Sequence, residues 1–97
     1  MRAPLRETGS ILVPASRDRV YEALAASLAQ EPALRVEPGA RVEAGLRTFV
    51  LKDAPGGTRV IHALAADANY AAIGKRPRET LREQVEMELF RLQKRFE

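Results

Sequence analysis

The stretch PRETLREQVEMELFRLQKRFE, residues 77–97, has the residue spacing of a long amphipathic helix. Its large apolar residues recur every three or four positions, which places them on one stripe of a helix with 3.6 residues per turn. They are Leu81, Val85, Leu89, Leu92 and Phe96, and Met87 and Phe90 are predicted to widen the stripe. Charged residues fill the other side. We therefore expect one face of this helix to meet solvent and the other to pack on a sheet.

Two signals indicate where this helix begins. Thr80 and Glu83 have the spacing of a capping box, in which two side chains satisfy free N–H groups at a helix start. Pro77 is also compatible with a first turn, where its missing N–H costs nothing. The helix is predicted to begin at Pro77 or at Thr80.

The clearest β signal is a hairpin in which residues 46–53 and 58–66 flank Ala54-Pro55-Gly56-Gly57. Proline followed by glycine suits the central positions of a type II turn, because proline presets φ and glycine accepts the positive φ that follows. The turn pairs residues whose numbers sum to about 111 or 113, a register that sorts the side chains onto two faces. One face receives Phe49, Leu51, Val60, His62 and Leu64, and the other receives Thr48, Val50, Lys52, Arg59 and Ile61. We expect the terminal helix to cover the first face.

The first third of the chain reads as a strand over residues 9–14, stopped by Pro14, and then a helix. Ser16 is the expected N-cap of that helix, with Asp18 in its first turn, and the helix is expected to end before Pro32. Residues 1–8 are predicted to form a loose N-terminal arm.

Two segments carry weaker signals. Residues 34–43 suggest a short strand, a turn at Pro38-Gly39 and a second short strand, with Val36 and Val42 as the β formers. Residues 67–74 are compatible with a continuing strand through Asn69 and Tyr70 or with a loop. The predicted fold is one α+β domain over residues 1–97, with an antiparallel sheet of about four to six strands gripping the long C-terminal helix and a short helix after the first strand. A ferredoxin-like sandwich is the alternative.

Composition narrows the functional classes. The chain has 97 residues, enough for one thin core, and no cysteine, which excludes disulfides and thiolate metal sites. The net charge of +3 is a mild bias, so nucleic-acid binding is not favoured. No apolar run approaches the roughly 20 residues that span a bilayer, and the first ten residues lack the apolar segment of a signal peptide. We expect a cytoplasmic protein that needs no metal or cofactor.

Three local patterns resemble a known superfamily. They are ILVPAS at residues 11–16 followed by VYEAL at 20–24, then GGTRV at 56–60, and finally the closing helix with Leu89, Leu92 and QKRF at 93–96. In this order the patterns are similar to START-like domains, the helix-grip superfamily of polyketide cyclases, dehydrases and lipid-transfer proteins. The resemblance implies a curved sheet around the long helix, with an apolar cavity that binds lipids or polyketides. Members are usually much longer, so this chain resembles an abridged member.

Function is predicted as a small, non-enzymatic binding module for a hydrophobic or lipid-like ligand between the sheet and the terminal helix. The candidate ligand-binding residues are Phe49, Leu51, Val60, His62, Leu64, Tyr70, Met87 and Phe90. His62 is the only histidine and points inward, where it can be a general acid or base or a hydrogen-bonded core residue. Catalysis would need a second positioned group, and no recognisable spacing supplies one, so an enzyme is not expected.

The alternative function is an interaction or scaffold protein whose shortened sheet closes on the helix without a cavity. Its surface would be the basic cluster of Lys75, Arg76, Arg78 and Arg82 at the start of the terminal helix. The favoured interpretation of that cluster is a solvated patch relieved by Glu79 and Glu83, since surface charges seldom carry specific function. A homodimer through a sheet edge or the helix is a further expectation, because a narrow sheet leaves two edges open.

Overall fold

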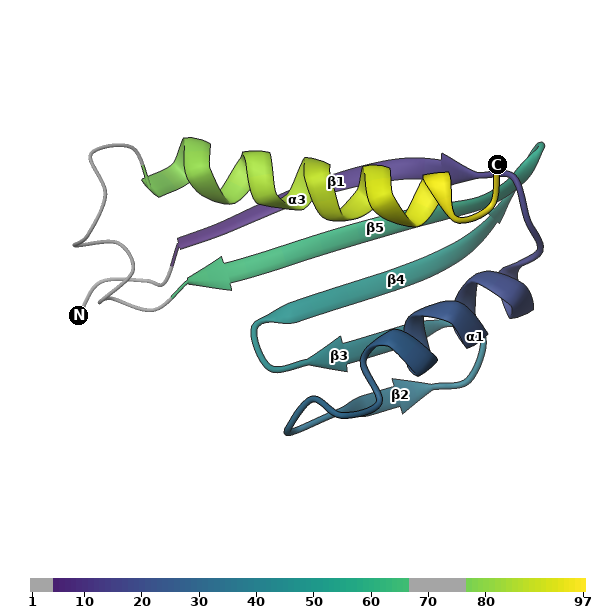
Figure 1. Cartoon of the computed structure of the whole chain (residues 1–97), viewed down its shortest axis with the longest axis horizontal. Coiled ribbons are helices and arrows are strands. Elements are labelled where there is room, and N and C mark those ends of the chain that lie inside the picture. The colour runs from purple at the N-terminus through teal and green to yellow at the C-terminus, as the bar shows by residue number, and fades with distance from the viewer. Residues whose placement is uncertain (1–4, 67–76) are drawn as a thin grey trace.

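The computed structural model describes residues 5–66 and 77–97, which fold as an α+β unit with one five-stranded antiparallel sheet (Figure 1). In chain order the elements are β1 (Leu5–Val13), α1 (Arg17–Ser27), β2 (Arg35–Glu37), β3 (Arg41–Ala44), β4 (Arg47–Ala54), β5 (Gly57–Ala66) and α3 (Pro77–Lys94). The strand order is β1-β5-β4-β3-β2. This confirms the predicted class, and the run of four consecutive strands differs from the β-α-β-β-α-β order of a ferredoxin-like sandwich.

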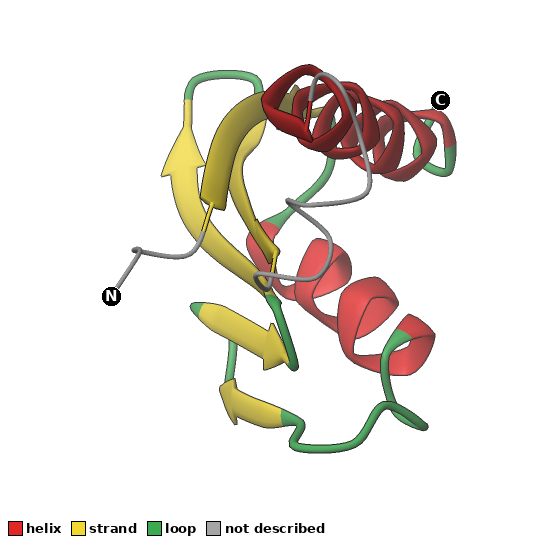
Figure 2. Cartoon of the chain, turned by 90° about the vertical axis from the view of Figure 1, so that its left-hand side faces the viewer, coloured by secondary structure: helices red, strands yellow, loops and turns green. Residues whose placement is uncertain are grey.

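Both helices lie on the same side of the sheet but over different strands (Figure 2). The long helix α3 runs along β1 and β5, whereas α1 packs on β3, β4 and β5. Just after α3, Arg95 nevertheless donates a hydrogen bond to Ser27 of α1. The apolar residues of both helices share a single core with the sheet, which includes Val20 and Leu24 from α1 and Val85 and Leu89 from α3.

The register of the β4–β5 hairpin agrees with the prediction. Arg47 pairs with Leu64, Phe49 with His62 and Leu51 with Val60, so the residue numbers of each pair sum to 111. Gly56 has φ +87°, as the third position of a type II turn requires. The predicted inward face is buried in all five positions, which are Phe49, Leu51, Val60, His62 and Leu64.

The apolar stripe of α3 is narrower than expected. Leu81, Val85, Leu89 and Leu92 are buried, and Phe96 is partly buried against the core. The prediction that Met87 and Phe90 widen the stripe is wrong, because these side chains are 51% and 53% exposed. Successive helix residues are rotated by about 100°, so a residue one or two positions from Leu89 points away from the sheet.

The position of α3 on the sheet depends on Gly9 in β1. A Cβ atom at Gly9 would lie 2.9 Å from Val85 Cγ1 and 3.3 Å from Leu89 Cδ1, so the missing side chain lets the helix approach this strand. Gln93 Nε2 also donates a hydrogen bond to the Leu12 carbonyl oxygen at 3.0 Å. The sequence predicts that the helix packs on the β4–β5 hairpin, whereas α3 packs on β1 and β5.

The remaining local predictions differ from the structure mainly at the N-terminus. Residues 5–8, expected to be a loose arm, belong to β1 and pair with Ala63 to Ala66 of β5. These residues are mostly polar, so the sequence gives no apolar strand signal there, but β1 pairs with β5 along its whole length. The Ser16 cap of α1 and the short β2–β3 hairpin are confirmed. Residues 67–74, with the alternative strand or loop through Tyr70, lie outside the described residues.

Candidate functional site

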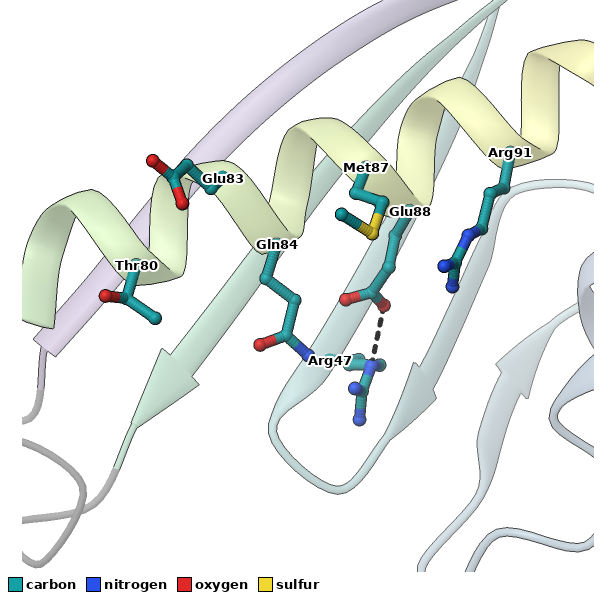
Figure 3. Close-up of a pocket in the computed structure, with 7 residues that line it drawn as sticks. All are labelled: Arg47, Thr80, Glu83, Gln84, Met87, Glu88 and Arg91. Atoms are coloured by element: carbon teal, nitrogen blue, oxygen red, sulfur yellow. Dashed lines mark hydrogen bonds and ion pairs between the residues drawn. The ribbon is translucent and has the colours of Figure 1, made fainter.

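An open groove follows the side of α3 that faces β4. Its middle part has a volume of about 500 Å³, within the roughly 300–1,000 Å³ typical of small-molecule sites. The residues around it are Arg47, Thr80, Glu83, Gln84, Met87, Glu88 and Arg91 (Figure 3). Six of these seven residues are polar or charged, but the aliphatic parts of their side chains and Met87 supply most of the surface, so the middle part suits a ligand segment of mixed character.

A smaller hollow lies between the two helices, and we call it the interhelix hollow. Its volume is about 170 Å³, and its apolar lining comes from Leu24 of α1, the C-cap residue Leu28, Phe49 of β4 and Leu92 of α3. Its polar border is formed by Ser27, Glu88, Arg91 and Arg95. Glu88 and Arg91 also border the middle part of the groove, so the two spaces adjoin.

A third hollow of about 210 Å³ extends the groove toward the first turns of α3. It is bordered by Leu46, Arg47, Leu64, Ala65, Ala66, Leu81 and Gln84. Arg47 and Gln84 are shared with the middle part. The three spaces together are called the α3 groove, and its most apolar part is the interhelix hollow.

Glu88 is the polar centre of the α3 groove. Arg47 Nε donates to Glu88 Oε1 at 2.7 Å, and His62 Nε2 lies 3.5 Å from the same oxygen. The Glu88 side chain is 21% exposed. Burial, the largest single influence, raises the pKa of Glu88, but hydrogen-bonding and electrostatic interactions with His62 and Arg47 outweigh it. The net result is a pKa below the ordinary value of 4.5.

His62 lies beneath this carboxylate and is fully buried, at 0% exposure. Its Nδ1 is 3.2 Å from the Thr48 carbonyl oxygen, and Nδ1 must carry the hydrogen because a carbonyl only accepts. The ring stacks on Phe49 with centroids 4.1 Å apart and planes 3° from parallel. Among residues 5–66 and 77–97, Nε2 of His62 and Oε2 of Glu88 are buried without a hydrogen-bond partner. His62 is thus positioned to support Phe49 and Glu88 rather than to meet a ligand.

The lowered pKa of Glu88 has a consequence for acid stability. Because its folded pKa lies below 4.5, Glu88 contributes stability above that pH and loses the contribution as the pH falls through the folded pKa. We expect Glu88→Gln to lower the free energy of unfolding at neutral pH by about 1–2 kcal/mol, since Arg47 and His62 lose an anionic partner. The difference from the wild type should shrink progressively below 4.5. Urea unfolding of both proteins across a pH series measures this difference in the free energy of unfolding.

The matched control for this series is Glu86→Gln, at an exposed position on the same helix. Its stability difference from the wild type should stay small throughout the series, as expected for surface substitutions. A Glu88→Gln difference that is constant from neutral to acid pH would show that the carboxylate charge is not the stabilising feature.

The predicted ligand-binding residues have separated into three groups. Phe49 is the floor of the interhelix hollow, and Leu64 and Met87 border other parts of the α3 groove. Leu51, Val60 and His62 are enclosed in the core. Phe90 is exposed beside Lys94, whose Nζ is 5.3 Å from the ring centroid, and Tyr70 lies outside the described residues.

The basic cluster is described only in part. Arg78 and Arg82 are exposed and share one carboxylate, with Arg78 Nη1 and Arg82 Nη2 lying 3.7 and 3.8 Å from Glu7 Oε1. Lys75 and Arg76 lie outside the described residues. The two described arginines therefore have a neutralising partner in β1, which agrees with the interpretation of a solvated patch.

Sequence reasoning missed the groove residues Glu88, Arg47, Arg91 and Arg95. One signal was present for Glu88, because the spacing of Val85, Glu88 and Leu92 puts this carboxylate at the edge of the apolar stripe. The hairpin register places Arg47 on the same face as Phe49, but no local signal shows that Arg47 and α1 approach α3, since this depends on the placement of two helices over one sheet. Tertiary structure alone brings these residues together.

The described residues also bear on metals and membranes. No group of three or more His, Cys, Asp or Glu side chains within residues 5–66 and 77–97 is arranged to hold a metal ion. No helix in the described part of the chain is long and apolar enough to cross a membrane.

Comparison of the sequence with protein-family models and with curated proteins found no match. Functional inference therefore rests on the groove itself.

Proposed function

We propose that this chain is a small, non-enzymatic binding module whose hydrophobic or lipid-like ligand inserts its apolar part into the interhelix hollow. The observation that carries the proposal is the composition of that hollow. Leu24, Leu28, Phe49 and Leu92 form its apolar lining. A concave apolar site with a few polar groups at its border is the usual form of a small-molecule pocket. The resemblance to START-like domains supports the same class of ligand.

The site proposed here is displaced from the one expected between the sheet and α3. Leu51, Val60 and His62 are closed beneath the helix, so they support the site without contacting the ligand. The ligand would lie beside α3, between it and α1, and extend along the adjoining middle part of the α3 groove. The burial of His62 also favours a non-enzymatic module. A catalytic base must reach the proton it removes, and His62 is enclosed in the core.

The test is binding of phenylnaphthylamine, a neutral fluorescent apolar probe, to the purified protein. We expect saturable binding and a raised melting temperature, since a ligand of the native state stabilises it by mass action. Leu28→Trp, which places a larger ring in the hollow, should weaken binding at least roughly tenfold, or about 1.4 kcal/mol. Mass spectrometry of co-purified material would then identify candidate natural ligands.

The control is Ala26→Trp, which adds the same ring at an exposed position of α1. It should bind the probe as the wild type does. Absence of binding to the wild type, or equal binding by Leu28→Trp, would leave the scaffold function as the better proposal. In that case substitution of Arg78 and Arg82 is the next experiment, and sedimentation tests the expected homodimer.

A further inference from the structure

We infer that the ligand of the interhelix hollow is an organic anion, whose acidic head group is bound by Arg91 and Arg95 while its apolar part fills the hollow. This inference rests on the proposed function and adds the chemical class of the ligand. The inference is based on the positive charge at the border of the hollow. The interior is apolar, and both arginines lie at its border.

The first step concerns the placement of the two guanidinium groups. Arg91 lies in the last turn of α3 and Arg95 directly follows the helix, with Arg95 N donating to the Arg91 carbonyl oxygen at 3.3 Å, so the two are neighbours on one side of the helix end. Like charges four residues apart destabilise a helix by a few tenths of a kcal/mol. An anion bound between them would remove that repulsion.

The second step concerns the partners these arginines have. Arg95 Nη1 donates to the Ser27 hydroxyl at 2.6 Å, a neutral acceptor on α1. Arg91 has no ion pair within residues 5–66 and 77–97. The nearby carboxylate of Glu88 is occupied by Arg47 and His62, which are the two residues that lower its pKa. Within the described structure, the positive charges of Arg91 and Arg95 are therefore not balanced by a carboxylate.

Nearby charges determine how the ligand is oriented in the groove, and the volume of the hollow limits the size of its apolar part. Glu83 borders the groove eight positions before Arg91, about 12 Å along the helix, and would repel an anion at that end. The head group is therefore assigned to the Arg91 end. A cavity of about 150 Å³ accepts benzene, so the hollow of about 170 Å³ takes one ring or a short alkyl group. Carboxylates, sulfonates and phosphates all fit the planar fork of arginine.

The test compares two probes with the same rings. Anilinonaphthalene sulfonate is anionic, and phenylnaphthylamine lacks only the sulfonate. We expect the wild type to bind the sulfonate roughly tenfold more tightly, as one good charge-assisted contact provides. Arg91→Gln and Arg95→Gln should each bring the ratio of the two affinities close to one, and because this ratio compares two probes in the same variant, a general change in the hollow cancels from it. Urea unfolding of each variant confirms that the fold is retained.

The control is Arg59→Gln, an exposed arginine on the opposite face of the sheet. It should keep the full preference for the sulfonate. Equal loss in Arg59→Gln, or equal affinity of the wild type for both probes, would overturn the anion inference while leaving the binding module intact. Failure of both probes to bind would overturn the binding module and the inference together.

Discussion

Replacement of Gly57 by alanine is expected to lower the free energy of unfolding by about 3–4 kcal/mol. Gly57 begins β5 with φ +152°, a conformation that side chains other than glycine rarely adopt. A Cβ atom there would lie 2.0 Å from the Val13 carbonyl oxygen and 3.0 Å from the Pro14 Cα. Both are backbone atoms, so no rotamer change relieves the overlap. Urea unfolding of the purified variant measures the loss, which is large beside the roughly 5–15 kcal/mol of a small domain.

Gly45→Ala separates backbone overlap from unfavourable φ. Gly45 lies between β3 and β4 with φ +59°, and a Cβ atom there would have no neighbour within 4 Å. Only the left-handed conformation is then penalised, at about 1–2 kcal/mol. If Gly45→Ala and Gly57→Ala lost the same stability, the close approach of β5 to the end of β1 would not be the cause.

The parts of the fold that local chemistry determines were predictable from sequence. Pro55 and Gly56 specify a turn, the turn specifies a register, and the register places Phe49 and His62 opposite each other on the inward face. The stripe of α3 follows in the same way from its spacing. The prediction for Met87 was based on its apolar character. Its angular position on the helix points the side chain to solvent instead.

The candidate site depends on features that no local pattern carries. Gly9 lets α3 approach β1 closely, and the interhelix hollow takes its lining from three separate elements, α1, β4 and α3. The polar strand start at residues 5–8 is recognised only through its partner β5. Membership of the START-like superfamily stays a prediction, since the α+β sheet with a C-terminal helix is compatible with helix-grip folds without specifying one.

His62→Ala is the second substitution with a large expected effect, a loss of about 3–4 kcal/mol in the free energy of unfolding. The ring is fully buried and stacked on Phe49, so its removal leaves a cavity inside the core. Glu88 also loses its contact with His62 Nε2 at 3.5 Å. Urea unfolding at neutral pH measures this loss. Because Phe49 is the floor of the interhelix hollow, affinity for the neutral probe should fall as well.

His62→Leu distinguishes the packing role of this residue from its polar contacts. Leucine restores most of the lost volume but neither the hydrogen bond to Thr48 nor the contact with Glu88. Volume-conserving core changes usually cost less than about 1.5 kcal/mol, so His62→Leu should recover more than half of the stability lost in His62→Ala. Equal losses in the two variants would mean that the polar contacts dominate. The groove would then depend on the polar contacts among Arg47, Glu88 and His62 rather than on a ring packed against Phe49.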